Sequence, residues 1–402
     1  MGGVSMEWKE VRLGDVCSEL SDGLHKAPKF IVNGEYIFVN AKNLYNGYIL
    51  DNDPTKKTSH EEYLKYKKPL GKHTILYSID GTIGNIAKYR GEKCVLGKGA
   101  CYINCNPEIV ESSYLYYQLQ SPHFKSYIHL MSTGSTIKHI SLKTMRDYVF
   151  ELPSLEDQRR IASILSSLDR KIELNNKINA DLEEMAQAIF KNWFVDFEPF
   201  KDGKFVDSEL GMIPEGWKVG SPYEYVKVVY GAPYKSAKFN DNGEGLPLIR
   251  IRDLKDCNPQ FYTPEILPQT EYVNMGDIVA GMDAEFVPHI WKGNTGLLNQ
   301  RVCKLMPQQT SISNLFVLYL MKPELEFVQS YKTGTTVSHL GKADIDKFVV
   351  VLPPLKVVEE CSKILDSILQ RIKNISAESR TLSTLRDTLL PRLMSGELEV
   401  PE

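Results

Sequence analysis

The sequence predicts an α+β protein in which two similar mixed α/β domains are separated by two long helices that pair as an antiparallel coiled coil. Three observations lead to this fold class: an internal repeat, short strand-like runs in each copy, and a long helical stripe after each set of runs. Because the two copies match, we expect pseudo-twofold symmetry inside a single chain.

The repeat is clearest where each domain ends. Residues 133–136 (TGST) recur 200 residues later as residues 333–336 (TGTT). Upstream the offset drifts by a few residues, as loops of different length would cause, so that residues 96–103 align with 298–305. A repeat of this length is too long for a solenoid unit, so we expect each copy to be a domain with an appendage.

Strand-like and helical regions divide each copy. Short β-branched and aromatic runs bounded by Gly, Asn, Asp and Pro fill its first part, and a long helical pattern follows a Leu-Pro pair. The clearest strand candidates are residues 36–40, 74–78, 277–281 and 348–352. We expect a first domain, a central helix, a linker, a second domain and a C-terminal helix at residues 1–153, 154–198, 199–216, 217–353 and 354–402.

Each long helix carries residues at alternating spacings of four and three that form the seam of a coiled coil. The apolar seam positions of the first helix are Ile161, Leu165, Leu168, Ile172, Leu182 and Ile189. Those of the second helix include Leu365, Ile368, Ile372, Ile375, Leu382 and Leu389. A helix of about 35 to 40 residues would run roughly 50 to 60 Å.

The seams have two possible partners. We expect them to pack on each other, because a duplicated domain-plus-helix unit then closes with twofold symmetry. The alternative is that each seam packs on its own domain. Asn175 and Asn179 interrupt the first seam, where they could fix the register of the helix pair or be tolerated as hydrated positions.

Composition describes a chain with enough material for two cores. Of the 402 residues, 42% are hydrophobic and 25% charged. The first residues show no secretion-signal pattern, and no run approaches the roughly 18 to 20 apolar residues of a membrane span, so we expect a cytoplasmic protein with no membrane contact. The seven cysteines form no Cys-x-x-Cys pair, so we expect reduced, mostly buried thiols and no metal site.

The net charge of −3 is unevenly distributed. Residues 1–153 carry +3, residues 154–216 carry −5, and residues 217–353 are neutral. A protein that held DNA alone through many phosphate contacts would usually be basic overall. Any DNA affinity of this chain is therefore expected to be weak without a partner.

The sequence shows no recognisable catalytic motif. It has no Gly-x-Gly-x-x-Gly loop, no Walker lysine motif and no Asn-Pro-Pro-aromatic tetrapeptide. The glycine-rich run at residues 80–84 (DGTIG) lacks a lysine to reach a phosphate, so its first role is to turn the chain after a strand. His25, His60, His123 and His289 have no companion at metal-ligand spacing. We predict no catalytic residue.

Two motifs resemble signatures of the specificity subunits of type I restriction-modification systems. Residues 190–199 (FKNWFVDFEP) resemble the central signature, and residues 389–398 (LLPRLMSGEL) the carboxy-terminal one. They stand at corresponding ends of the two helices. Residues 281–286 (GMDAEF) also resemble the second recognition domain of that family, with Ala284 in place of the usual Gly, so the backbone of that turn could differ.

The resemblance implies a protein that reads DNA without catalysis. In this family each domain is a target-recognition domain for one half of a bipartite double-stranded DNA site, and the helices set the gap between the halves. It further implies two modification (methyltransferase) subunits docked on the helices, and restriction subunits. S-adenosylmethionine, ATP and Mg would then be bound by those partners, with no cofactor in this chain. The acidic central helix suits docking of a protein better than contact with phosphate.

Candidate DNA contacts follow from the chemistry of base edges and phosphates, since Arg and Lys suit guanine, Asn and Gln suit adenine, and hydroxyls suit phosphates. Residues 39–44 align with 249–254, which makes the best candidates matching pairs of loops. The candidates are Lys42, Asn43, Lys98, Thr133, Gly134, Ser135, Thr136, Lys138, Arg250, Arg252, Asn299, Gln300, Arg301, Thr333, Gly334, Thr335 and Thr336. The alternative for each is an exposed charge or a hydrogen bond to its own loop. For the Thr-rich turns, a phosphate clamp competes with a structural role in which Ser141 merely caps a short helix.

Two other functional classes compete with a DNA reader. A coiled-coil adaptor or DNA-mimic inhibitor would need strongly acidic domains, which the charge distribution contradicts. A self-sufficient methyltransferase or nuclease would need a cofactor loop that the sequence lacks. If both domains face one duplex, half-sites about one helical turn apart would suit a two-domain reader.

Overall fold

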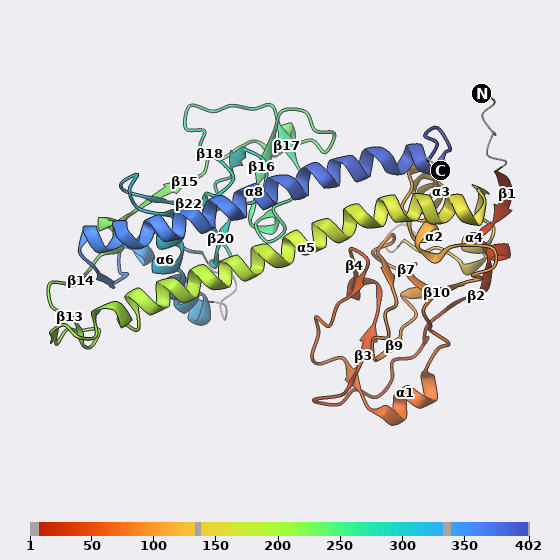
Figure 1. Ribbon diagram of the computed structural model, residues 1–402, viewed down its shortest axis with the longest axis horizontal. Helices are drawn as coiled ribbons and strands as arrows, with labels where there is room; N and C mark the ends of the chain where they lie inside the picture. The colour runs from red at the N-terminus through yellow and green to blue at the C-terminus, as the bar shows by residue number, and fades with distance from the viewer. Residues whose placement is uncertain (1–7, 133–137, 333–338, 401–402) are drawn as a thin grey trace. The chain divides into compact units, whose positions relative to one another are not determined.

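The computed structural model describes residues 8–132, 138–332 and 339–400, and the chain divides into two compact units (Figure 1). The first unit comprises Met1–Lys171 and Leu382–Glu402, and the second comprises Ile172–Thr381. Each unit therefore contains one globular domain and a part of both long helices.

The domain of the first unit is built on four small sheets. Its main sheet is antiparallel, with the strand order β2 (Cys17–Asp22), β10 (Ala100–Cys105), β7 (Thr74–Ser78) and β8 (Ile86–Lys88). A second sheet has the order β6 (Lys57–Thr58), β3 (Tyr36–Val39) and β9 (Cys94–Leu96), with β3 and β9 parallel. The ends of the domain meet where β1 (Lys9–Arg12) pairs with β11 (Val149–Leu152). A short hairpin joins β4 (Leu44–Tyr45) to β5 (Tyr48–Ile49).

The domain of the second unit repeats the main sheet and the closing pair, and its second sheet has one strand more. Its main sheet has the order β15 (Val226–Tyr230), β22 (Val302–Pro307), β19 (Ile278–Gly281) and β20 (Pro288–Ile290). Its second sheet has the order β17 (Tyr262–Thr263), β16 (Leu246–Ile249), β21 (Gly296–Leu298) and β18 (Tyr272–Val273), with β16 and β21 parallel. The closing pair is β14 (Lys218–Gly220) with β23 (Val350–Leu352). The predicted duplication of a mixed α/β domain is confirmed.

Short helices complete each domain and show one local difference. The first domain has α1 (His60–Tyr66), α2 (Ser112–Gln118), α3 (Pro122–Met131) and α4 (Leu142–Arg146), whereas the second has α6 (Asn314–Lys332) and α7 (Lys342–Ile345). Where α2 ends and α3 begins, Ser121 caps the new helix and Pro122 occupies its first turn. In the second domain Pro323 lies inside the continuous α6. In the expected linker, which follows α5 and precedes the second domain, β12 (Phe205–Val206) pairs with β13 (Ile213–Pro214).

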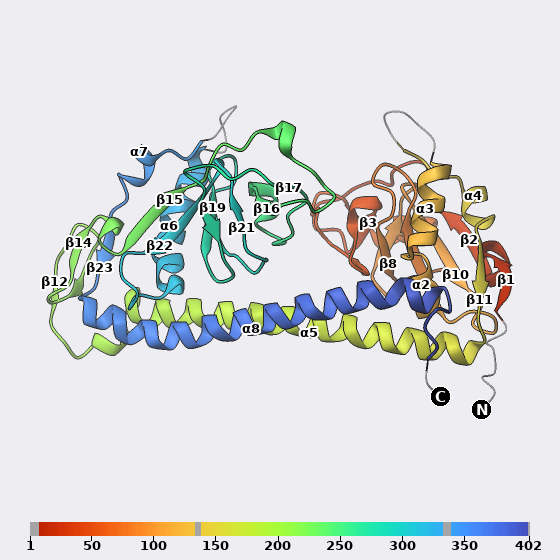
Figure 2. The same cartoon turned by 90° about the horizontal axis from the view of Figure 1, so that it is seen from above.

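The long helices α5 (Leu155–Phe194) and α8 (Leu355–Met394) each contain 40 residues. In the second unit, Asn175 Nδ2 donates to Glu378 Oε2 at 2.8 Å, and Asn179 Nδ2 donates to Ser376 Oγ at 3.0 Å. The partner number falls as the α5 number rises, which defines an antiparallel pair (Figure 2). The predicted antiparallel pairing is therefore confirmed.

These polar contacts replace apolar packing in the middle of the seam. Asn175 and Asn179 are both buried. A buried amide needs its partner, because an unmatched polar group in the interior is costly to stability. Their hydrogen bonds would be lost if the helices slid along each other, which favours the register-fixing interpretation over a hydrated seam.

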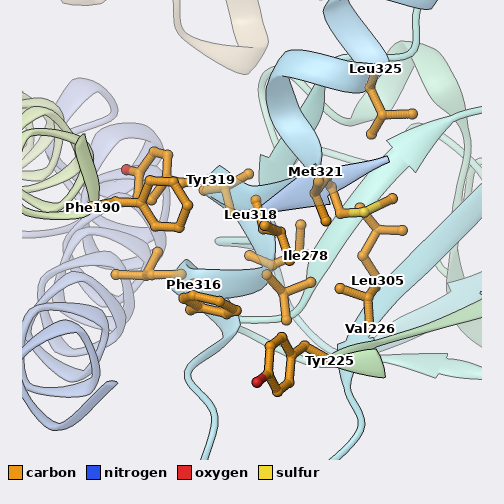
Figure 3. Packing of buried hydrophobic residues seen from close by; sticks show 14 of the residues in the cluster. Phe190, Tyr225, Val226, Ile278, Leu305, Phe316, Leu318, Tyr319, Met321 and Leu325 are labelled. Carbon is orange, nitrogen blue, oxygen red and sulfur yellow. The ribbon is translucent and has the colours of Figure 1, made fainter. Parts of the chain in front are cut away.

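Away from this polar layer, the seams pack on the domains as well as on each other. The first domain's core includes Ile161 and Leu165 from the start of α5 together with Leu390 and Leu393 from the end of α8. The second domain's core includes the start of α8 and the end of α5, whose Phe190 packs against the tilted rings of Phe316 and Tyr319 of α6 (Figure 3). Both partners considered for the seams are therefore used, at different positions along each helix.

The contacts between the long helices and the domain differ in the two units. In the first unit, Asp169 on α5 accepts hydrogen bonds from Tyr117 Oη at 2.6 Å and from Arg386 Nη1 of α8 at 2.9 Å. The positions 200 residues away hold Leu369 and Ala186, both of which lie in the apolar core of the second unit. A polar junction in one unit thus corresponds to an apolar one in the other.

Six of the seven cysteines are buried and Cys17 is half-buried, and all seven are free thiols. Burial raises the pKa of most of them, as for Cys101 and Cys303, each to about 12. Within the described ranges, no helix has the length and apolar content that crossing a membrane requires.

The matched seam positions give a test of this packing. Leu165→Ala and Leu365→Ala each remove a fully buried side chain 200 residues apart in the repeat. Each change is expected to lower the free energy of unfolding by about 3 kcal/mol, because it leaves a cavity where a domain meets both helices. Urea unfolding followed by circular dichroism measures the loss. The controls are Met185→Ala and Leu385→Ala, at exposed positions of the same helices, which should change the free energy of unfolding by less than about 0.5 kcal/mol. Equal losses at all four positions would contradict the burial of Leu165 and Leu365 at the seams.

Candidate nucleic-acid interface

Loops that are distant in the sequence converge at one edge of the first domain. The N–H of Gly97, after β9, donates to the carbonyl of Val39 at the end of β3 at 2.8 Å. The N–H of Ile140 donates to the carbonyl of Ile79, just after β7, at 2.9 Å. The N–H of Ile79 in turn donates to the carbonyl of Gly99 at 3.0 Å. The candidate residues Lys42, Lys98 and Lys138 all belong to these loops.

The second domain brings its equivalent loops together with the same kind of backbone bond. The N–H of Asn299 donates to the carbonyl of Ile249 at 3.2 Å, and the N–H of Leu340 donates to that of Met282 at 2.7 Å. The N–H of Met282 donates to the carbonyl of Arg301 at 2.9 Å. Each domain thus holds one set of converging loops built by the same main-chain plan.

In the first domain one aspartate, Asp80, lies beside two basic side chains where these loops converge. His139 Nδ1 lies 2.8 Å from Asp80 Oδ1, and Lys98 Nζ lies 3.9 Å from Asp80 Oδ2. The side chain of Asp80 is 26% exposed, whereas those of His139 and Lys98 are 44% and 51% exposed. The carboxylate therefore lies beneath two more exposed nitrogen-bearing groups.

The second domain repeats this arrangement with an arginine. His339 Nδ1 lies 2.7 Å from Asp283 Oδ1, and Arg301 Nη1 lies 3.1 Å from Asp283 Oδ2. The exposed fractions are 27% for Asp283, 48% for His339 and 54% for Arg301. We call each set, Asp80–His139–Lys98 and Asp283–His339–Arg301, an Asp–His–base cluster.

Three predicted contacts turn inward and take the alternative role of bonding to their own loops. Buried Asn43 accepts a hydrogen bond from the N–H of Asn40 and donates to the carbonyl of Leu50, both at 3.0 Å. Arg250 donates from Nε to Asp253 Oδ2 at 3.1 Å, and its guanidinium covers the ring of Phe261.

Asn299 is the third of these residues. It is buried, and its Oδ1 accepts a hydrogen bond from the N–H of Arg301 at 3.1 Å. The polar groups of Asn43, Arg250 and Asn299 hold the loops in shape, as the alternative for each of them expects, and their contact with DNA stays a prediction.

The remaining described candidates are on the surface. Lys42 is exposed and lies 3.4 Å from Asp53 through its Nζ, and Lys138, Arg252 and Gln300 are also exposed. DNA contact by these residues stays a prediction. Eight further candidates lie outside the described residues: Thr133, Gly134, Ser135, Thr136, Thr333, Gly334, Thr335 and Thr336.

Ser141 does cap α4, because its Oγ accepts a hydrogen bond from the N–H of Thr144 at 3.0 Å.

Comparison with known proteins identifies the duplicated domain. Residues 6–184 and 214–382 each match the family model described as "Type I restriction modification DNA specificity domain". The chain belongs to this family. The converging loops and the Asp–His–base clusters therefore lie in the two recognition domains of a specificity subunit.

Relatives resemble the chain along its length. The MjaIX specificity subunit of Methanocaldococcus jannaschii is 28% identical, over 93% of this chain and 86% of its own. The HindI specificity subunit of Haemophilus influenzae is 23% identical, over 98% and 100%. A crystal structure of the type I restriction-modification S subunit from M. genitalium has a TM-score of 0.53 at 16% identity, over 98% of both chains. That likeness supports the fold.

The two family-like motifs have a packing role in the structure. In the central motif, Phe194 and Phe197 pack against Trp217 at the start of the second recognition domain. In the carboxy-terminal motif, Leu393 and Met394 lie in the core of the first recognition domain. These signatures of the specificity subunit therefore mark where each helix ends on a domain.

The Asp–His–base clusters were missed because their members are far apart in sequence. Asp80 and His139 are 59 residues apart, and Asp283 and His339 are 56 apart. The repeat does single out the two histidines, since His139 and His339 stand 200 residues apart and each follows a Thr-rich run. No spacing pattern linked either histidine to its aspartate.

The turn after each aspartate has the same backbone in both recognition domains. Gly81 has φ of +71°, and Ala284, which follows Asp283, has φ of +59°. The sequence left open a different backbone at Ala284, and the structure instead places it in the left-handed region, which disfavours any residue with a Cβ.

Ala284→Gly is therefore expected to raise the free energy of unfolding of the second unit by about 1 kcal/mol, and Gly81→Ala to lower that of the first by a similar amount. No atom lies within 4 Å of a Cβ at Gly81, so strain and not crowding would cause that loss. Urea unfolding measures both changes. A loss of stability in Ala284→Gly would mean that this turn adopts another conformation in solution.

Proposed function

We propose that this specificity subunit reads a bipartite DNA site for a type I restriction-modification complex, with one recognition domain for each half-site and no catalysis of its own. The observation that carries the proposal is the duplicated interface, in which each domain presents basic and polar side chains on converging loops above the same buried framework. Two similar surfaces with different side chains suit two half-sites of different sequence.

The side chains that differ between the domains are the candidates for reading bases. Lys42 in the first domain corresponds to Arg252 in the second, and Lys98 corresponds to Gln300. Lysine and arginine suit guanine O6 and N7, whereas glutamine suits adenine N6 and N7. Lys42 and Arg252 are therefore alike in the base that they suit, whereas Gln300 would favour adenine in the second domain.

The helix pair would set the gap between the half-sites. A 40-residue helix is about 60 Å long. The buried polar contacts of Asn175 and Asn179 favour a single register for α5 against α8. A fixed register would keep the gap constant, and half-sites about one helical turn apart would suit such a reader.

The partners follow from the same proposal. Two modification subunits would dock on the helices and methylate adenine with S-adenosylmethionine, and restriction subunits would use ATP and Mg. Exposed apolar side chains at equivalent positions support two similar docking surfaces: Met185 is 53% exposed and Leu385 is 44% exposed, 200 residues apart. Large apolar groups exposed at matching sites are typical of protein contacts.

Methylome mapping of a host with and without this gene tests the reader and the gap together. The expected result is a bipartite adenine-methylation motif with a gap of constant length that disappears on deletion. An unchanged methylome in a host with an active modification subunit would refute the reading function. A motif with a variable gap would refute the spacing role alone.

The docking surfaces are tested by Met185→Glu and Leu385→Glu, assayed separately. Each is expected to reduce the complex from two modification subunits to one, because a buried unpaired carboxylate opposes docking. Native mass spectrometry counts the subunits. Leu64→Glu, at a 51%-exposed position on α1, is the control and should keep two. Two bound subunits in both helix variants would place docking elsewhere.

A further inference from the structure

We propose that the Asp–His–base cluster of each recognition domain is a phosphate-binding site, in which Asp80 or Asp283 is a positioning residue for the histidine and the basic side chain. This inference rests on the proposed DNA-reading function and assigns a specific role to six residues. The ligand is a DNA phosphodiester of the half-site that each domain reads.

The first step concerns how the aspartate orients its neighbours. In each cluster a carboxylate oxygen faces histidine Nδ1, at 2.8 Å in the first domain and 2.7 Å in the second. An imidazole bonded through Nδ1 directs Nε2 away from the carboxylate. The second carboxylate oxygen faces the lysine or arginine. One aspartate therefore fixes two cationic or donor groups side by side.

The second step concerns burial. Both aspartates are about one quarter exposed, whereas the histidine and the base above them are about half exposed in each domain. A ligand approaching this surface meets the nitrogen-bearing groups before the carboxylate. Histidine and lysine or arginine donors suit phosphate oxygens, to which many protein–DNA hydrogen bonds are made.

The third step distinguishes a phosphate from a base. Contacts that read bases are expected to differ between two domains that read different half-sites. The Asp–His contact is instead nearly the same in both domains, at 2.8 and 2.7 Å, and the exposed fractions of the three side chains agree closely. Side chains that both domains share suit the part of DNA that both half-sites share, which is the backbone.

The domains also reach the shared arrangement by different routes. Lys98 and Arg301 are not aligned in the repeat, because Lys98 corresponds to Gln300, yet both bases lie beside the equivalent aspartate. The arrangement therefore persists although the position that supplies the cation has changed by one residue. Both domains thus place a cation beside the aspartate, although they supply it from different positions of the repeat. This supports a common ligand.

The sharpest test is removal of the aspartate. Asp80→Ala removes a negative charge, so an aspartate that merely repelled DNA would, when lost, give tighter binding. A positioning aspartate predicts the opposite, about a tenfold weaker Kd, with Asp80→Asn intermediate because it keeps a hydrogen-bond acceptor. Asp283→Ala and Asp283→Asn are the matched pair in the second domain. The full-length chain in complex with its modification subunits is titrated with a duplex carrying its methylation motif, by fluorescence anisotropy.

A second set of variants keeps the proposal testable if the aspartate variants fold poorly. His139→Gln and His339→Gln are expected to weaken binding by a similar factor for every duplex sequence, as loss of a phosphate contact does. The methylated motif should be unchanged. His129→Gln, an exposed position on α3, and Asp15→Asn, an exposed position between β1 and β2, are the controls and should bind as the unaltered complex does.

The outcomes separate this inference from the proposed function. If the unaltered complex does not distinguish its motif from a scrambled duplex, the reading function itself fails. If it does, and Asp80→Ala and Asp283→Ala bind as tightly or more tightly, the positioning role is refuted. A changed methylation motif in the histidine variants would mean that the cluster reads bases and not phosphate.

Discussion

The antiparallel pairing of α5 with α8 is the interaction on which the rest of the structure depends. Neither recognition domain completes its core from its own consecutive sequence, since each also takes apolar side chains from the start of one helix and the end of the other. The polar contacts of Asn175 and Asn179 lie in the second unit between these two helices. Helix register and domain packing are therefore parts of one constraint, because sliding the helices would withdraw side chains from the cores.

The repeat conserves geometry more strictly than chemistry. The strand order of the main sheet and the closing strand pairs are the same in the two domains, yet Asp169 and Arg386 in the first unit correspond to Leu369 and Ala186 in the second. An ion pair and an apolar contact can fill equivalent space, provided that each buried group finds a suitable partner. Duplication thus left each unit free to change its internal contacts while the backbone plan stayed the same.

Much of the fold could be predicted from the sequence, because periodicity reports burial directly. The alternating spacing at Leu165 and Leu365 identified both long helices, and the Leu-Pro pairs marked where they begin. The interface was less predictable. Asn43, Arg250 and Asn299 have side chains suited to bases, but the same donors and acceptors suit loop hydrogen bonds, and residue type alone does not distinguish the two uses. The Asp80–His139 contact depends on two loops that only the folded sheet brings together.

The contribution of Leu390, Leu393 and Met394 to the first domain's core bears on the order of events during synthesis. These residues leave the ribosome long after most of that core, which is encoded before residue 166. The second domain takes its outside contribution from Ala186, Phe190 and Phe194, which emerge before the rest of it. The later-made domain can thus complete its interior as it emerges, whereas the earlier one remains open until the end of α8 has been made.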